Sequence, residues 1–274
     1  MVKSIADYEL IQSLGEGSHG SFWLARCPER LGVDTDQVAV KIFAHNAAEG
    51  DLDRLWHELR YYRSVTSPHL AEIYEVGQQG AVLYYAGEYF PDGSLARPAR
   101  PFSRSVVLAA LAAAARGAHA LHEAGVAHRD IKPGNVMLDD EGAKLGDPNL
   151  ATVLNPGQTI TGLDRLGAIE YLAPELVQGQ SATRSSDIWA LGATMHRVLT
   201  GRSVYPDLPD GSLLEALRHL LNERPTLNET LRPEERAIVE RTLATDPVDR
   251  PATAADLAET VEELARRLAA AEPT

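Results

Sequence analysis

Short apolar runs alternate with polar turns over the first ninety residues, a pattern that is typical of β-strands. The segment 38–44 is an apolar run of the buried-strand type, and helical spacing of apolar residues predicts an amphipathic helix over 51–65. This part of the chain is therefore predicted to be β-rich with one helix. Its other strands are expected at 8–14, 21–26, 70–76 and 81–90, and a turn is expected at 77–80.

Beyond residue 91 the apolar positions take a helical spacing. An Ala- and Leu-rich helix capped by Ser103 or Ser105 is expected to run to about Ala124, where Gly125 suits its end. A Gly-, Pro- and Asn-punctuated stretch follows over 126–175. The pattern predicts an α+β fold with a β-rich part and a mainly helical part. Further helices are expected near 185–200, 211–222, 233–244 and 253–270.

Composition and charge exclude several classes of protein. The 274 residues carry 26 basic and 39 acidic side chains, a net charge of −13, so no nucleic-acid partner is expected. Cys27 is the only cysteine, which excludes an intramolecular disulfide and a zinc site of several thiolates. It also favours a cytoplasmic location. No signal peptide and no membrane segment are expected, because the longest apolar run, 106–115, is short.

Two motifs in the β-rich part point to phosphate binding. Gly15, Gly17 and Gly20 lie between two expected strands, where glycines let backbone N–H groups approach phosphate oxygens. A plain hairpin turn is the alternative. Lys41 lies inside an apolar strand, where a buried ammonium needs a partner, and Glu58 on the following helix is a candidate. The alternative is an edge-strand lysine that reaches water.

The segment 128–135, His-Arg-Asp-Ile-Lys-Pro-Gly-Asn, carries the most specific motif in the chain. With it the sequence resembles the protein kinase superfamily, whose catalytic loop has His-Arg-Asp and, after four residues, Asn. The lysine after the aspartate is typical of Ser/Thr-specific kinases, and the overall style is similar to that of the bacterial ones. Other segments that resemble family motifs are the glycine-rich loop at 15–22, the hinge strand at 88–90, Ala-Pro-Glu at 173–175, the start of the central C-lobe helix at 186–192, and the motif at 246–251 whose arginine pairs with the Ala-Pro-Glu carboxylate.

The resemblance implies a bilobal fold, with an N-lobe over 1–90 and a C-lobe over 91–274 that together form one protein kinase domain. It implies a chain that uses ATP and Mg²⁺, with Mn²⁺ as an alternative, to phosphorylate Ser or Thr in protein substrates. Autophosphorylation is a further expectation. A regulatory protein partner or a dimer would be compatible with a chain of this kind.

Roles for individual residues also follow from the resemblance. Lys41, oriented by Glu58, would contact the α- and β-phosphates of ATP. Asp130 would orient or deprotonate the substrate hydroxyl, and Lys132 would steady the γ-phosphate. The metal ligands would be Asn135 and Asp147. Nucleotide contacts, with core packing as the alternative for several of them, would come from Leu14, Gly15, Gly17, Gly20, Phe22, Ala39, Glu88, Phe90 and Met137.

Three positions depart from the family pattern. Asp147 is followed by Pro148 and Asn149 where the family has Phe and Gly. We therefore expect the backbone of Asp147 to be extended and the loop that it begins, the metal loop, to be less mobile. Ala168 stands where a threonine would bridge the catalytic aspartate and lysine. Gly87 before the hinge would open a pocket behind the adenine, unless the alignment is shifted by one residue.

These departures keep alternatives open. A pseudokinase that binds nucleotide with little turnover is one, and a kinase-fold enzyme that acts on a small molecule is another. Regulation is expected in the segment 147–175, where Thr159 and Thr161 are candidate phosphorylation sites and Arg129 is a candidate phosphate partner. Ordinary loop threonines are the alternative.

Overall fold

The computed structural model describes residues 4–17, 20–43, 49–140, 142–147, 166–209 and 212–271, with the backbone alone for 17, 49–55 and 166–168. The described residues form two compact units. The first comprises residues up to 66 together with 71–89, and the second comprises 67–70 and the described residues from 90 onward. The division near residue 90 falls where the apolar spacing changes from a strand pattern to a helical one.

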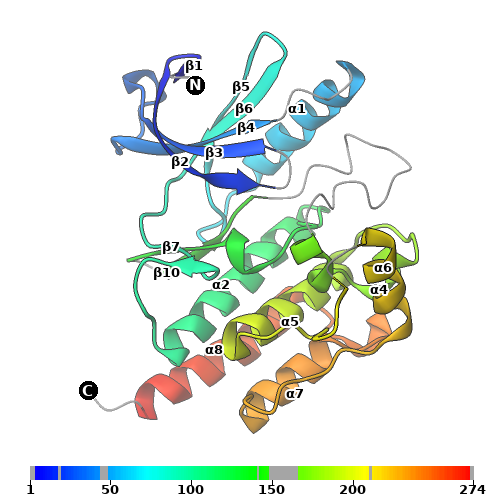
Figure 1. The fold of residues 1–274 in the computed structure, drawn as a ribbon. Helices are drawn as coiled ribbons and strands as arrows, with labels where there is room; N and C mark the ends of the chain where they lie inside the picture. Colours follow the sequence, from blue (N-terminus) through cyan, green and yellow to red (C-terminus); the bar gives the residue numbers. More distant parts are fainter. Residues whose placement is uncertain are drawn as a thin grey trace. The chain divides into compact units, whose positions relative to one another are not determined.

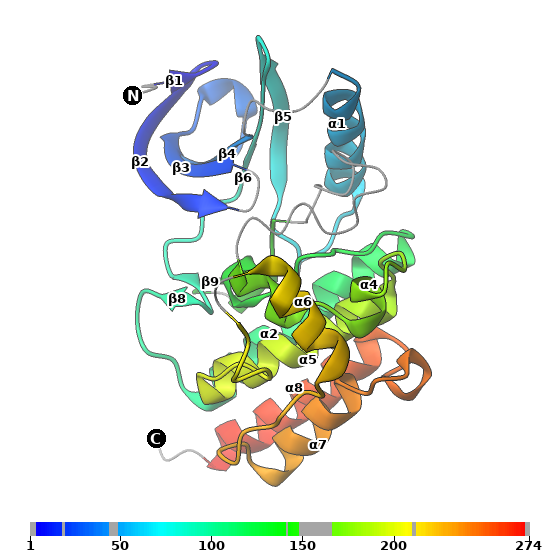
Figure 2. The same ribbon diagram turned by 45° about the vertical axis from the view of Figure 1, so that its right-hand side comes forward.

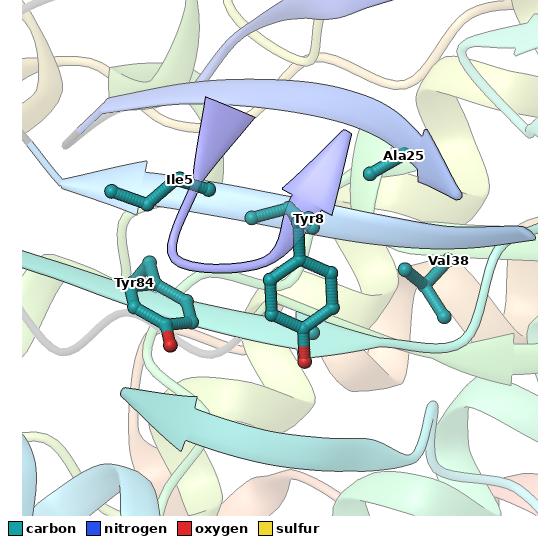
Figure 3. Close-up of a cluster of buried hydrophobic side chains, with 7 residues drawn as sticks. Ile5, Tyr8, Ala25, Val38 and Tyr84 are labelled. Atoms are coloured by element: carbon teal, nitrogen blue, oxygen red, sulfur yellow. The ribbon is translucent and has the colours of Figure 1, made fainter. Parts of the chain in front are cut away.

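The first unit is built on an antiparallel sheet with alternating faces. Val38 and Val40 are fully buried on one face, where they pack with Tyr8 and Tyr84 (Figure 3). Because successive side chains of a strand point to opposite faces, Lys41 lies on the other face. The described strands run in the order β1 (Ser4–Ile5), β2 (Tyr8–Gly17), β3 (Gly20–Arg26), β4 (Gln37–Phe43), β6 (Val82–Gly87) and β5 (Ile73–Gln79).

Helix α1 (Glu49–Ser64) lies beside β5 in the first unit (Figure 2). Its inward side chains Leu59 and Tyr62 are buried and three residues apart, as the amphipathic pattern predicts. The helix therefore matches the segment predicted at 51–65 to within two residues at each end.

Two predictions about β5 are wrong. Residue Gly77 belongs to the strand, opposite Tyr84, so the predicted turn at 77–80 is displaced to Gly80 and Ala81. A Cβ at Gly77 would lie 2.2 Å from the Tyr84 ring, which explains a glycine inside a strand. The strand also begins later than predicted, because Leu70 belongs to the second unit.

The second unit is mainly helical and contains all four helical patterns predicted after residue 185. Helix α2 packs against α5 and α8 (Figure 1). Its described helices are α2 (Arg104–Glu123), α4 (Pro174–Val177), α5 (Arg184–Thr200), α6 (Leu213–Asn222), α7 (Pro233–Thr242) and α8 (Ala254–Ala271). A small sheet adds β10 (Gly142–Leu145), β9 (Val136–Asp139), β7 (Gly93–Ser94) and β8 (Arg97–Pro98), paired in that order.

The long helix α2 is capped as the sequence predicts. The Ser103 hydroxyl accepts the Val106 N–H at 3.4 Å, and Gly125 after the helix has a φ of +81°. By length and composition α2 could cross a membrane, which corrects the expectation that no segment approaches a span. In the structure 56% of its most apolar window is buried inside the protein, as in a core helix.

Candidate active site

Two residues of the catalytic loop donate hydrogen bonds to the carboxylate of a third, Asp130, in the second unit. Lys132 Nζ donates to Asp130 Oδ2 at 2.6 Å. Asn135 Nδ2, at the end of the short helix η2 (Pro133–Asn135), donates to the same oxygen at 3.0 Å and to the Asp130 carbonyl at 2.7 Å. The Asp130 side chain is therefore oriented by two hydrogen-bond donors, of which the Lys132 ammonium is charged. The structure thus brings together the residues that the sequence predicted for catalysis in this loop.

The loop is held in place by Asp187, a residue for which the sequence predicted no role at the site. Its buried carboxylate, in the first turn of α5, accepts the backbone N–H of His128 at 2.7 Å and that of Arg129 at 2.9 Å. The ring Nε2 of His122, at the end of α2, lies 2.8 Å from the same carboxylate. Asp187 is therefore a positioning residue that links α2 and α5 to the catalytic loop.

The backbone takes an unusual conformation at two points of the candidate site, one in the catalytic loop and one after β10. Arg129 has a φ of +70° and Asp147 a φ of +53°, both in the left-handed region. The expectation that Pro148 would keep Asp147 extended is therefore wrong. A hydrogen bond accounts for this, because Asn135 Nδ2 donates to the Asp147 carbonyl at 3.3 Å and an aspartate tolerates this conformation better than most residues.

Burial shifts the pKa values of two loop residues in opposite senses. It raises the pKa of the Asp130 carboxyl, and the nearby Lys132 ammonium opposes that shift. It lowers the pKa of His128, which is completely buried, so the imidazole is neutral at pH 7. Both ring nitrogens of the neutral form are matched: Nε2 donates to the Gly146 carbonyl at 3.1 Å, and Nδ1 accepts the Asp130 N–H at 3.4 Å.

The predicted metal ligands fit a hard cation. Asn135 and Asp147 offer an amide and a carboxylate, and the Asn135 Nδ2 is engaged within the protein, so its oxygen is the atom left for a metal. Among the described residues no three or more His, Cys, Asp or Glu side chains gather as a metal site. A pair of oxygen ligands suits Mg²⁺, which keeps waters and substrate phosphates as its other ligands.

Lys41 is buried in the sheet of the first unit. Only 3% of it is exposed, and its Nζ lies 4.9 Å from the centroid of the Phe22 ring and 5.3 Å from that of Phe43. Its strand β4 is interior, between β3 and β6, so the alternative of an edge-strand lysine that reaches water is wrong. Glu58 is half-buried on α1. Its pairing with Lys41 stays a prediction.

The glycine-rich segment joins β2 to β3. A Cβ at Gly20 would lie 2.0 Å from the Ile42 carbonyl oxygen, so glycine is required there by close packing. Gly15 has a φ of +134° and no described atom within 4 Å of an added Cβ, which is compatible with the close approach of a ligand. Residues 18 and 19 lie outside the described part, and Gly17 is described as the last residue of β2 by its backbone alone. Phosphate binding by this hairpin stays a prediction.

A close backbone approach explains the glycine that precedes the expected hinge. Gly87 pairs with Ala39 on β4 and with Ile73 on β5, and an added Cβ would lie 2.5 Å from the Glu72 carbonyl oxygen. That carbonyl accepts the Glu88 N–H at 2.9 Å, and the Glu72 N–H donates to the Glu88 carboxylate at 3.2 Å. The pocket predicted behind the adenine stays a prediction.

The other residues predicted to contact nucleotide divide between the two units. Leu14, Phe22 and Ala39 belong to the sheet of the first unit, and Leu14 is 39% exposed. Phe90 and Met137 belong to the second unit, where Phe90 is buried and Met137 is half-buried on β9.

Several predicted features fall outside the described residues. These include Pro148 and Asn149 and the candidate phosphorylation sites Thr159 and Thr161. For Ala168 the backbone alone is described, as part of the short helix η3 (Leu166–Tyr171). Regulation through this segment stays a prediction.

A buried ion pair confirms one long-range prediction from the sequence. Arg250 Nη1 and Nη2 donate to the two carboxylate oxygens of Glu175 at 2.6 and 2.9 Å. The guanidinium also lies 4.9 Å from the centroid of the Trp189 ring on α5. The pair ties the Ala-Pro-Glu segment to the segment before α8, as the resemblance implied.

Comparison with known proteins identifies the family. A family model described as the protein kinase domain matches residues 8–261, so the chain belongs to the protein kinase family. This confirms the predicted α+β kinase fold, and the names of the relatives below support the predicted class, a serine/threonine protein kinase.

Several curated relatives are bacterial serine/threonine-protein kinases. The chain is 32% identical over 270 residues to the serine/threonine-protein kinase PknK of Mycobacterium bovis. The matched region covers 96% of this chain and 24% of the relative. It is 31% identical over 263 residues to the serine/threonine-protein kinase PrkC of Bacillus subtilis, covering 91% of this chain and 39% of that one. The chain thus spans less than half the length of either relative.

Proposed function

We propose that the chain transfers the γ-phosphoryl group of ATP to the hydroxyl of serine or threonine in proteins. The observation that supports this most directly is the convergence of Lys132 and Asn135 on the Asp130 carboxylate, in a chain of the protein kinase family. The serine/threonine kinases named among its relatives support the substrate class.

The proposed chemistry assigns one role to each of these residues. The hydroxyl oxygen of the substrate forms a bond to the γ-phosphorus, the bond from that phosphorus to the bridging oxygen of ADP breaks, and the hydroxyl proton passes to Asp130. A carboxyl pKa raised by burial makes Asp130 a better proton acceptor than an exposed aspartate. The Lys132 ammonium offsets negative charge on the phosphoryl group as it moves.

The residues that would hold the metal are Asn135 and Asp147. When bound, Mg²⁺ supplies neutralisation of charge on the phosphates of ATP. Asn135 has the further task of orienting Asp130, because its amide nitrogen donates to that residue. Lys41, oriented by Glu58, is proposed to contact the α- and β-phosphates.

Incorporation of labelled phosphate from ATP tests the proposal. We expect the wild-type chain with Mg²⁺ to label a generic basic protein, and the matched Asp130→Asn variant to do so far more slowly, because the amide cannot accept the proton. Equal labelling by the two proteins, or none by either, would overturn the proposal. Mass spectrometry of the chain itself then shows whether Thr159 or Thr161 is autophosphorylated.

A binding measurement separates an active kinase from a pseudokinase. ATP with Mg²⁺ at 100 times its dissociation constant should stabilise the folded chain by about 2.7 kcal/mol. Stabilisation without labelling would favour a nucleotide-binding regulatory module. A Lys41→Met variant checks the nucleotide contact, since we expect it to weaken the stabilisation by ATP.

A further inference from the structure

Three strands of the first unit bring one row of side chains together on a single face of the sheet. Lys41 on β4 lies directly opposite Phe22 on β3 and directly opposite Tyr85 on β6. These strands are neighbours in the sheet (Figure 1), and directly opposite residues share a face, so the three side chains form one row. Phe43 lies two residues beyond Lys41 on β4 and therefore shares that face. The three aromatic side chains, Phe22, Phe43 and Tyr85, form an aromatic cradle beside the lysine.

The rings of the cradle contact the ammonium and one another. Lys41 Nζ lies 4.9 Å from the centroid of the Phe22 ring and 5.3 Å from that of Phe43, within the range of a cation–π contact. The Tyr85 ring lies edge-on to the Phe22 ring, with centroids 6.4 Å apart and an interplanar angle of 78°. It is also tilted against the Phe43 ring at 6.1 Å. Tyr85 therefore supports the two rings that contact the lysine.

The cradle restricts the lysine side chain. Lys41, Phe43 and Tyr85 are 3%, 5% and 6% exposed, and Phe22 is half-buried. A lysine that is free in water samples many rotamers, and a ligand that must fix it loses affinity. Here the protein itself holds the rotamer, so the ammonium is pre-organised for a ligand.

Rings suit this task better than carboxylates or aliphatic side chains. The face of an aromatic ring carries partial negative charge and offsets part of the cost of burying an ammonium. A ring does not neutralise the ammonium, which keeps its full positive charge for the phosphates of a nucleotide. An aliphatic side chain at position 22 would fill space without offering such a face.

We propose that Phe22 and Phe43, supported by Tyr85, are positioning residues that hold the Lys41 ammonium ready for the phosphates of the nucleotide. The inference rests on the proposed function, in which Lys41 contacts the α- and β-phosphates. Direct contact of Phe22 with the base of the nucleotide is the alternative. The two roles have different requirements, because the cradle acts only through Lys41 and the phosphates.

A double-mutant cycle on the full chain tests the proposal. Phe22→Leu keeps an apolar side chain and removes the ring, and Lys41→Met removes the ammonium. The ligand is ADP with Mg²⁺, which keeps the α- and β-phosphates and is not a phosphoryl donor. We expect Phe22→Leu to weaken its binding about tenfold, as loss of a buried cation–π contact would, which is about 1.4 kcal/mol. In the Lys41→Met background Phe22→Leu should have no further effect.

Matched controls separate the cradle from a direct contact. Adenosine has no phosphates, so Phe22→Leu should leave its affinity unchanged, and equal weakening of adenosine and ADP would assign Phe22 to the base and overturn the proposal. Phe22→Tyr keeps the ring face and should restore the affinity for ADP to within about twofold of the wild-type value. Phe102→Leu removes a ring that lies 4.7 Å from the Arg100 guanidinium in the second unit, and it should leave both affinities unchanged.

A spectroscopic measurement reports on the cradle without any ligand. In a chain with isotope-labelled lysine, ring currents should shift the ε-methylene signal of Lys41 upfield, and the Lys41→Met variant should lack this signal. The signal should move back downfield in Phe22→Leu and stay in Phe22→Tyr. A wild-type spectrum without an upfield-shifted lysine signal would refute the contact, whether or not the variants fold.

Failure of the cradle can be told apart from failure of the proposed function. If Lys41→Met binds ADP as tightly as the wild-type chain, the proposed phosphate contact is wrong and the cradle inference falls with it. If Lys41→Met weakens binding but Phe22→Leu does not, or does so equally in both backgrounds, the cradle inference alone is wrong. Tighter binding by Phe22→Leu would also contradict it, because the rings would then hold the lysine away from the nucleotide.

Discussion

Asp187 is the residue whose loss should disturb the catalytic loop most, and Asp187→Asn tests this with almost no change of shape. The carboxylate accepts the N–H groups of His128 and Arg129 and lies 2.8 Å from the Nε2 of His122. An asparagine keeps one oxygen and replaces the other by an NH₂ group, which donates and cannot accept. One oxygen must then serve donors that two oxygens served before.

The geometry sets the magnitude. The remaining oxygen can accept from Arg129, and the NH₂ group then faces the His128 N–H and the ring of His122. The ring can adapt, because its Nδ1 has no hydrogen-bond partner in the described structure and can take the proton. The His128 N–H cannot, so one buried donor is unpaired, at about 1–3 kcal/mol. Loss of the charge on the remaining bonds adds about 1 kcal/mol, so we expect a loss of about 2–4 kcal/mol.

Unfolding by denaturant measures this loss of stability. The slope of the free energy of unfolding against denaturant concentration should stay unchanged, which indicates that the folded state is intact. Asp246→Asn is the matched control, because Asp246 is an exposed helix cap and asparagine caps as well as aspartate. Hydrogen exchange should show faster exchange of the His128 and Arg129 amides in the Asp187→Asn variant alone, and the rate of phosphoryl transfer should fall with it. A loss below about 0.5 kcal/mol with unchanged exchange would refute the assigned role.

Three further predictions concern other buried contacts. Gly192→Ala should destabilise by about 1–3 kcal/mol, because its Cβ would lie 2.2 Å from the Thr242 hydroxyl oxygen; alanine in a helix is otherwise favourable. Arg250→Met should cost about 3–5 kcal/mol, because Glu175 is left buried without its partner. Burial lowers the pKa of His196, so its contribution to stability should be complete above about pH 6.5 and be lost as the pH falls.

Unfolding curves check all three, each against its own control. For Gly192→Ala, the double variant with Thr242→Ala should recover part of the loss, and the absence of recovery would contradict the proposed clash. For Arg250→Met, a loss no larger than that of an exposed ion-pair variant such as Arg266→Met would contradict it. For His196, the free energies of unfolding of the wild-type chain and of His196→Gln should differ by a constant amount above about pH 6.5, and below it the wild-type chain should lose stability relative to the variant by up to about 1.4 kcal/mol per pH unit; curves that stay parallel below about pH 6.5 would refute the assignment.

Periodicity predicted the helices because a helix is a local structure. The cap at Ser103 and the apolar spacing that follows it both lie within a few residues of each other, and α2 begins where they indicate. The turn predicted at 77–80 failed for the opposite reason. Gly77 looks like a turn residue in the sequence, but its partner across the sheet is Tyr84, and only the register of two strands reveals that the ring needs the space.

The same distinction applies to the candidate site. Asp130, Lys132 and Asn135 lie within six residues, so one motif was sufficient to predict that they act together. Asp187 lies 58 residues beyond Arg129. In the sequence it reads as an ordinary acidic residue in the first turn of a helix, where it suits the helix dipole. The sequence offered one signal, which is that Asp187 lies within a segment that resembles a family motif. The three groups that donate hydrogen bonds to its carboxylate are visible only in the fold.

The left-handed backbone at Arg129 and Asp147 gives Asn135 a second task. Such a conformation costs about 1–2 kcal/mol at each residue that is not glycine, so each needs a compensating contact. Arg129 has its N–H bond to Asp187, and Asp147 has the bond from the Asn135 amide to its carbonyl. Loss of activity in an Asn135 variant therefore has two causes, a lost metal ligand and a released backbone.

Asn135→Asp separates them, since it keeps an oxygen ligand and removes the donor. We expect faster amide exchange over 145–147 without any metal present, and unchanged exchange there would show that the metal role alone explains the defect.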